Sequence, residues 1–172
     1  PNTSAKILKW ARQKAPAQNY LFYFWSHQIA PLNRVARFFG SFDDSHPTKD
    51  FSAEVLRQSF IQAGFDGVNE KFKAIVFSSC YGSNLQNLFQ LGDFTEYFLG
   101  AGFRLLYDAG LSRQFISRLS ENNIEEVLSF IYDQAVTAIL KPRQDLMIKD
   151  KPRQSSLPFL LNTEQFAALK TQ

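Results

Sequence analysis

A single cysteine, Cys80, and two histidines, His27 and His46, are the residues from which this chain could build a thiol nucleophile with its base. A thiol becomes nucleophilic when a neighbouring base or cation lowers its pKa. The histidines lie 53 and 34 residues before Cys80 (80 − 27 and 80 − 46), so only the fold could bring either one close. We therefore expect Cys80 to be a small apolar residue at a helix end without a catalytic role, and an enzyme acting through it is the alternative. His27 is expected to be partly buried and hydrogen-bonded, and His46 to lie in a turn.

Motifs of metal and nucleotide sites are missing from the sequence. His27, His46 and Cys80 do not have the spacing of a metal site, which needs three or four ligands within reach. Gly100-Ala101-Gly102 could begin a dinucleotide fingerprint, but Leu105 occupies the position of its third glycine. No phosphate-binding loop and no serine between glycines occurs either. The sequence predicts no cofactor and no metal, and no motif identifies a family.

The single cysteine also excludes an internal disulfide within these residues and favours a reducing, cytoplasmic location. No apolar run approaches the roughly 20 residues that a membrane-spanning helix needs. The first dozen residues read as a basic helix, and no apolar segment with a cleavage site follows, so we expect no secretory signal. An acid-free, arginine-containing start also resembles a mitochondrial presequence in composition.

Charge is segregated along the chain. Residues 1–42 contain six bases and no acid, residues 43–140 contain 13 acids and 7 bases, and residues 141–172 contain 6 bases and 3 acids. The three blocks carry +6, −6 and +3, which sum to the net charge of +3. This segregation indicates a basic start, an acidic middle and a basic end, and it bears on partners more directly than the total does.

The basic residues of both terminal segments, together with one tryptophan, form the candidate partner-binding set. They could contact an acidic protein surface or a second copy of the chain, because the basic start and the acidic middle are complementary. Nucleic acid and an anionic membrane surface are also possible partners, and solvated outer faces of ordinary core helices are the simpler interpretation. The candidate residues are Lys6, Lys9, Trp10, Arg12, Lys14, Arg34, Arg37, Lys141, Arg143, Lys151 and Arg153.

Helix signals recur along the chain. Residues 4–15 are predicted to form an amphipathic helix because their basic and apolar residues separate at about 3.6 residues per turn. Its exposed face is predicted to hold Lys6, Lys9, Arg12 and Lys14, and its other face Ile7, Leu8 and Ala11. Further helices are predicted after the capping residues Ser52, Ser83, Ser112 and Asn122, and a last one after Thr163.

Four more apolar segments, 20–30, 31–40, 68–79 and 94–106, are also predicted to be helical. A strand is the alternative at Leu21–Trp25 and at Ala74–Phe77, since short apolar runs fit either structure. The predicted class is all-α: a single-domain bundle of about eight helices. Its 18 phenylalanines suit a bulky core, with an aromatic-lined pocket for a greasy ligand as the alternative.

A repeated tetrapeptide marks the end of the predicted helical body. Lys141-Pro142-Arg143-Gln144 recurs as Lys151-Pro152-Arg153-Gln154, which indicates an extended and solvated segment. We therefore divide the chain into a helical domain, residues 1–140, and a basic proline-containing strap with a short C-terminal helix, residues 141–172. The strap is expected to pack on the body or on a neighbouring copy.

Together these patterns predict a non-enzymatic helical binding protein with an adaptor, regulatory or assembly role, which uses its basic terminal segments to engage an acidic partner. A nucleic-acid-associated helical protein and a helical pocket for an aromatic or lipidic ligand are the two alternatives. Phosphate contacts would make the affinity fall steeply with salt, which separates the nucleic-acid hypothesis from the others.

Overall fold

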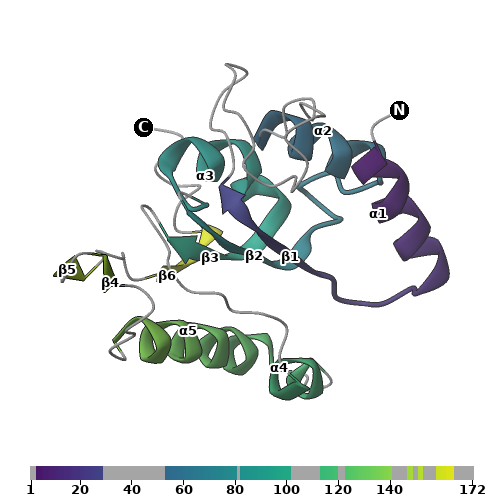
Figure 1. The fold of residues 1–172 in the computed structure, drawn as a ribbon. Helices are drawn as coiled ribbons and strands as arrows, with labels where there is room; N and C mark the ends of the chain where they lie inside the picture. Colours follow the sequence, from purple (N-terminus) through teal and green to yellow (C-terminus); the bar gives the residue numbers. More distant parts are fainter. Residues whose placement is uncertain are drawn as a thin grey trace.

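A central β-sheet with helices on both faces organises the chain (Figure 1). This computed structural model describes residues 3–28, 53–80, 82–101, 113–119, 123–140, 147–148, 151–152 and 158–164. The all-α prediction is therefore wrong, because the fold is α/β.

The sheet contains four strands in the order β1-β2-β3-β6. Their bounds are Leu21–Gln28 for β1, Phe72–Cys80 for β2, Thr95–Ala101 for β3 and Pro158–Asn162 for β6. Strands β1, β2 and β3 run parallel, and β6 runs antiparallel to β3. Two short strands, β4 (Met147–Ile148) and β5 (Lys151–Pro152), form a separate antiparallel pair.

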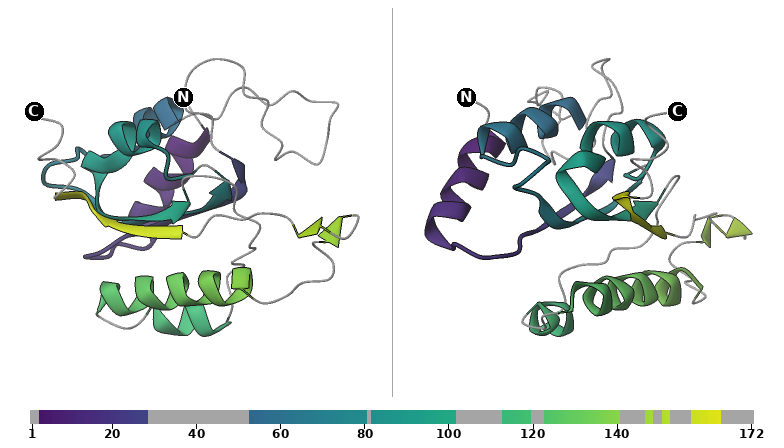
Figure 2. Two further views of the ribbon diagram at one scale, coloured as in Figure 1. Left: turned by 90° about the vertical axis from the view of Figure 1, so that its left-hand side faces the viewer. Right: turned by 180° about the vertical axis from the view of Figure 1, so that it is seen from behind.

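The helices lie in two layers, one on each face of the sheet (Figures 1 and 2). Helices α1 (Thr3–Lys14), α2 (Ala53–Gln62) and α3 (Leu85–Leu91) lie on one face, and a 3-10 turn, η1 (Gly92–Phe94), follows α3. Helices α4 (Arg113–Arg118) and α5 (Ile124–Leu140) lie on the other face. Both faces of the sheet are covered, as parallel strands require.

Phenylalanine rings fill the core between the sheet and helices α2 and α3. Phe60 is fully buried, and its ring centroid lies 4.8 Å from that of Phe72 and 5.1 Å from that of Phe22. Phe65 stacks on Phe72, and Phe77 contacts Phe98. Each buried phenylalanine contributes about 1.5–3 kcal/mol from the removal of apolar surface from water. Much of the aromatic content of the chain thus stabilises this core.

A second, smaller core separates the sheet from α5. Ala74, Val76 and Leu99 of the sheet meet Val127, Leu128 and Ile131 of the helix. The Asn123 side chain caps α5 by accepting hydrogen bonds from the backbone N–H groups of Glu125 and Glu126, at 3.1 and 3.4 Å. The Tyr97 hydroxyl of β3 donates to Glu125, and this bond raises the pKa of Tyr97. Strand β3 and helix α5 are therefore joined by both apolar and polar contacts.

Three segments predicted as helices are strands. Segments 20–30 and 94–106 contain β1 and β3, and segment 68–79 contains all of β2 except Cys80. The strand alternatives at Leu21–Trp25 and Ala74–Phe77 fall within β1 and β2. Helices predicted from Ser4 and after Ser83 are confirmed as α1 and α3. Those predicted after Ser52, Ser112 and Asn122 correspond to α2, α4 and α5. The helix predicted over 31–40 lies outside the described residues.

The C-terminal segment contributes one strand, β6, to the central sheet. Strand β6 belongs to the segment 141–172, yet it pairs with β3, with Leu161 opposite Phe98. Phe159 and Leu161 pack against the phenylalanine core. The Thr163 hydroxyl donates to the carbonyl oxygens of Thr95 and Glu96 at the start of β3. Beyond Glu164 the predicted C-terminal helix lies outside the described residues.

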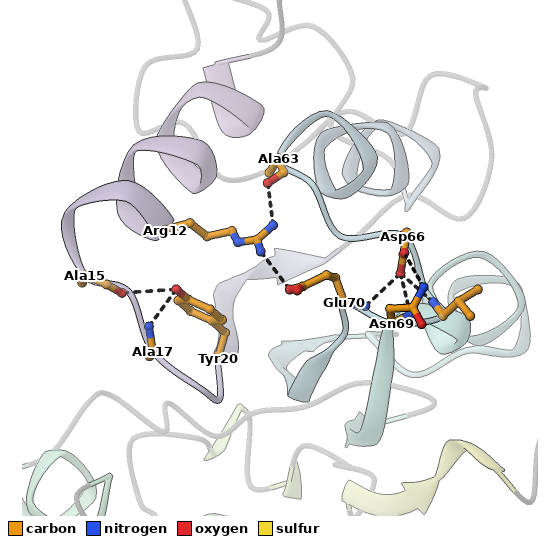
Figure 3. Close-up of polar contacts among 9 residues, drawn as sticks. Arg12, Ala15, Ala17, Tyr20, Ala63, Asp66, Asn69 and Glu70 are labelled. Atoms are coloured by element: carbon orange, nitrogen blue, oxygen red, sulfur yellow. Dashed lines mark hydrogen bonds and ion pairs between the residues drawn. The ribbon is translucent and has the colours of Figure 1, made fainter.

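Arg12 links α1 to the segment between α2 and β2 (Figure 3). Its guanidinium donates to the Ala63 carbonyl oxygen at 3.0 Å and to a Glu70 carboxylate oxygen at 2.8 Å. The guanidinium carbon also lies 4.6 Å from the ring centroid of Phe65. Arg12 therefore has a structural role, because it joins α1 to the segment before β2. The sequence predicted it on the exposed face of the helix.

We predict different stability costs for two alanine substitutions on α1. Arg12→Ala removes a hydrogen bond, an ion pair and a cation–π contact, and should lower the free energy of unfolding by about 1–2 kcal/mol. Lys9→Ala, at an exposed position of the same helix, should change it by less than about 0.5 kcal/mol. Urea unfolding followed by circular dichroism measures both. Equal effects of the two substitutions would contradict the structural role of Arg12.

The loop before β2 is organised by Asp66 (Figure 3). One carboxylate oxygen of Asp66 accepts hydrogen bonds from the backbone N–H groups of Val68, Asn69 and Glu70, at 2.8, 2.8 and 2.9 Å. These bonds, with that from Glu70 the largest contributor, lower the pKa of Asp66 to about 2. Gly67 has a φ of +76°, which suits the tight turn.

Asp66 should therefore titrate with a midpoint near 2 in the folded protein, which NMR can follow through the carboxyl carbon. Because the folded pKa lies below the ordinary value of about 3.9, the stabilisation is present above that value and is lost as the pH falls toward 2. In Asp66→Asn this part of the acid dependence of unfolding should disappear. A midpoint near 4 in the folded wild-type chain would contradict the loop geometry.

Candidate active site

The carboxyl ends of β1 and β2 bring His27 and Cys80 to neighbouring positions of the backbone. Parallel strands end at the same edge of a sheet, and adjacent strands lie about 4.8 Å apart. Cys80 is the last residue of β2 and pairs with Gln28, the last residue of β1. His27 directly precedes Gln28. The sheet thus joins a cysteine and a histidine that lie 53 residues apart in the sequence (80 − 27).

An irregularity in β1 coincides with this place. Trp25 pairs with Ser78 and Gln28 pairs with Cys80, so β1 advances three residues while β2 advances two. The extra residue falls at Ser26 or His27. Bulges of this kind are uncommon between parallel strands and occur preferentially next to active sites, where they change the direction of a side chain. The irregularity in the register therefore lies at His27 or at the residue directly before it.

The turn that follows Cys80 is fixed to the rest of the fold by its backbone. The Ser83 N–H donates to the carbonyl oxygen of Ala101, the last residue of β3, at 3.1 Å. The carbonyl oxygen of Gly82 accepts a hydrogen bond of 3.0 Å from the Asn87 side chain of α3. The Asn84 side chain caps α3 by accepting from the Asn87 N–H at 2.9 Å. Each residue from Gly82 to Asn84 is therefore held by a neighbouring element.

Ser83 and Gly100 approach each other closely beside this turn. A Cβ atom at Gly100 would lie 2.2 Å from the Ser83 hydroxyl oxygen and 3.3 Å from Phe77, so any larger residue here would have to displace the Ser83 side chain. The hydroxyl groups of Ser78 and Ser83 are buried and lack a hydrogen-bond partner among the described residues. These serines lie two residues before and three residues after Cys80. Two buried hydroxyl groups thus lie within three residues of Cys80 in the sequence.

The structure divides the predicted partner-binding residues into several groups. Lys6, Lys9, Trp10 and Lys14 are exposed on α1, with Trp10 61% exposed, whereas Arg12 is turned toward Glu70. Ile7, predicted on the inner face of that helix, is 59% exposed. For Lys151 the backbone lies in β5. The remaining candidates, Arg34, Arg37, Lys141, Arg143 and Arg153, lie outside the described residues.

The described residues contain neither a metal-binding cluster nor a membrane-spanning helix. No group of three or more histidine, cysteine, aspartate or glutamate side chains in these parts of the chain is placed to hold a metal ion. The prediction that the protein holds no metal stays a prediction. Over the same residues, no helix is both long enough and apolar enough to cross a membrane.

Solved structures with a similar fold are cysteine proteases of the C11 family. A secreted C11 protease from Bacteroides thetaiotaomicron, bound to an irreversible peptide inhibitor, matches 98% of this chain with 17% identity and a TM-score of 0.70. A second structure from that organism, called iotapain, matches with 16% identity and a TM-score of 0.63. An inactive zymogen C11 protease from Parabacteroides distasonis matches 96% of the chain with 15% identity and a TM-score of 0.60.

The matches cover nearly all of this chain but less than half of each solved chain. This chain covers 47%, 45% and 40% of the three solved chains, so it spans less than half of their length. No family model matches the sequence, and no curated protein does. At 15–17% identity the likeness establishes the fold and does not by itself carry the activity.

The likeness contradicts the predicted function class. A helical bundle with an adaptor role was expected, whereas the matching folds are α/β and belong to enzymes. The non-enzymatic interpretation depended on the distance in sequence between Cys80 and the histidines. The signal that could have corrected it was present, because His27 and Cys80 each follow an apolar run for which a strand was the alternative. Two parallel strands in those places would have put both residues at one edge.

We predict that Gly100→Ala destabilises the fold by about 1–3 kcal/mol, because the added methyl group meets the Ser83 hydroxyl and Phe77. Removing that hydroxyl in the double variant Ser83→Ala/Gly100→Ala should recover part of the loss. Urea unfolding of wild type, both single variants and the double variant gives the coupling between the two positions. Additive losses would show that Ser83 does not limit the space at Gly100.

Proposed function

We propose that this chain carries the nucleophile and the general base of a cysteine peptidase, with Cys80 as the nucleophile and His27 as the base. The observation that supports the proposal most directly is the pairing of Cys80 with Gln28, which puts the single cysteine beside His27 at the carboxyl edge of the sheet. The fold of the C11 cysteine proteases supports the same chemistry. The peptide inhibitor in one of those structures suggests peptide substrates.

The proposed reaction has two stages. The imidazole of His27 accepts the proton of the Cys80 thiol, and the thiolate attacks the carbonyl carbon of the scissile peptide bond. The carbon–nitrogen bond breaks, the amine leaves with the proton from the imidazolium, and a thioester joins the acyl group to Cys80. Water, deprotonated by His27, then attacks the thioester. The carbon–sulfur bond breaks, the carboxylic acid leaves and the thiol is restored.

The remaining expectations from the sequence stand beside this proposal. The exposed lysines Lys6, Lys9 and Lys14 could bind an acidic surface, and an acidic protein, a second copy, nucleic acid and an anionic membrane all stay predictions. A cytoplasmic location also stays a proposal, and the Bacteroides thetaiotaomicron protease is described as secreted. Because the chain spans less than half of the matching structures, the substrate range of the whole protein belongs to the proposal too.

Substitution of the two proposed residues tests the proposal. We expect the 172-residue chain to cleave members of a pool of internally quenched peptides, and Cys80→Ala to reduce the rate by about 1000-fold or more. His27→Ala should cause a comparable loss. Iodoacetamide should alkylate wild-type Cys80 with a pH midpoint below the ordinary thiol value of about 8.5, and His27→Ala should raise that midpoint toward 8.5.

His46→Ala is the matched control, because it removes the second histidine of the chain. It should leave both cleavage and the alkylation midpoint unchanged. Activity that persists in Cys80→Ala would overturn the proposal. A loss in His46→Ala without one in His27→Ala would show that His46, and not His27, is the base.

A further inference from the structure

Four residues, 81–84, connect the proposed nucleophile to the first residue of α3. Cys80 ends β2 and Leu85 begins the helix. Because the connection is only four residues long, the position of α3 restricts where the Cys80 backbone can lie. A nucleophile must be held within a fraction of an ångström of its productive position, because small displacements cost large factors in rate. What holds this connection in place is therefore part of the site.

Asn87 is a polar residue on the buried side of α3, which is otherwise apolar. Its side chain is completely buried, and its neighbours on the inner side of the helix are Leu88 and Leu91. Burial of an amide is unfavourable unless its polar atoms are hydrogen-bonded, so a leucine or valine would be expected here on packing grounds alone. The amide has a specific partner, since its Nδ2 atom donates to the carbonyl oxygen of Gly82 at 3.0 Å.

The hydrogen bond from Asn87 to Gly82 ties the turn after Cys80 to α3. Gly82 is itself buried and lies two residues after Cys80. On the next residue the Ser83 N–H is fixed to Ala101 of β3 at 3.1 Å. The strand ladder to Gln28 fixes the backbone at Cys80 from the other direction. Without the Asn87 donor, the Gly82 carbonyl loses the hydrogen bond that ties the turn to α3, two residues after Cys80.

We infer that Asn87 is a positioning residue for Cys80, which acts through the Gly82 carbonyl and not by contact with substrate. This inference rests on the proposed function, since it assigns a catalytic consequence to the bond. The same bond predicts an effect on the thiol itself. If the turn shifts, the cysteine moves relative to the proposed base, and the thiol pKa rises toward its ordinary value of about 8.5.

Two substitutions of Asn87 remove the donor in different ways. Asn87→Leu replaces the amide by an apolar group of similar volume, and Asn87→Asp keeps the shape but places an oxygen against the Gly82 carbonyl. Both are compared with wild type in the 172-residue chain. The measurements are the thermal midpoint by circular dichroism, the pH dependence of Cys80 alkylation by iodoacetamide, and kcat and KM for the quenched peptide that wild type cleaves fastest.

Ser59→Ala is the matched control. Ser59 is also completely buried, and its hydroxyl donates to the Val55 carbonyl oxygen within α2 at 2.7 Å. Its loss should affect the thermal midpoint without moving the alkylation curve. A general loss of stability is thereby separated from a displacement of the nucleophile.

We expect each Asn87 variant that folds to shift the alkylation midpoint upward and to lower kcat by about 10- to 100-fold with KM within about twofold of wild type. A folded Asn87→Leu or Asn87→Asp with the wild-type midpoint and kcat would overturn the inference. A wild-type midpoint already near 8.5, together with activity in Cys80→Ala, would instead overturn the proposed function. If neither variant folds, the inference is likewise overturned, because Asn87 is then required for the fold as a whole.

Discussion

Parallel pairing of β1, β2 and β3 requires apolar cover on both faces of the sheet, because side chains of each strand point alternately to either side. In β2 this is visible residue by residue, since Ile75 and Phe77 join the phenylalanine core while Ala74 and Val76 face α5. The two cores are thus consequences of one pairing. The same pairing fixes which strand ends meet at the carboxyl edge, and with them the place of Cys80.

The turn after Cys80 illustrates how closely the site is tied to this arrangement. Its backbone is bonded to the end of β3 through Ser83 and to α3 through Gly82, so two elements of the fold determine its path. Gly100 allows Ser83 to lie against β3 because it has no side chain. A site built from strand ends and a short turn is therefore positioned by packing and backbone bonds that are distributed over several segments. This accounts for the absence of a contiguous motif in the sequence.

Helices were predicted well where the signal was local. In α1 and α3 a capping residue and an apolar stripe lie within a few residues of each other, and the structure retains both helices. The cap positions differ slightly, since Asn84 rather than Ser83 caps α3, and Asn123 rather than Asn122 caps α5. Strands β1 and β2 gave no such signal. A strand covered on both faces is a continuous apolar run, and Leu21–Phe24 or Ala74–Phe77 reads equally well as one side of a buried helix.

The helical segments around α1 and α3, the phenylalanine-rich core and the residues available for chemistry, one cysteine and two histidines, could all be predicted from the sequence. These are local or compositional properties, which do not depend on what a segment packs against. Three features could be recognised only in the folded chain: the apolar runs are parallel strands, Arg12 turns toward Glu70, and the backbones of His27 and Cys80 meet at one edge of the sheet. Strand pairing joins residues far apart in the chain, and its register is set by the burial of both faces together, which no short window of sequence contains.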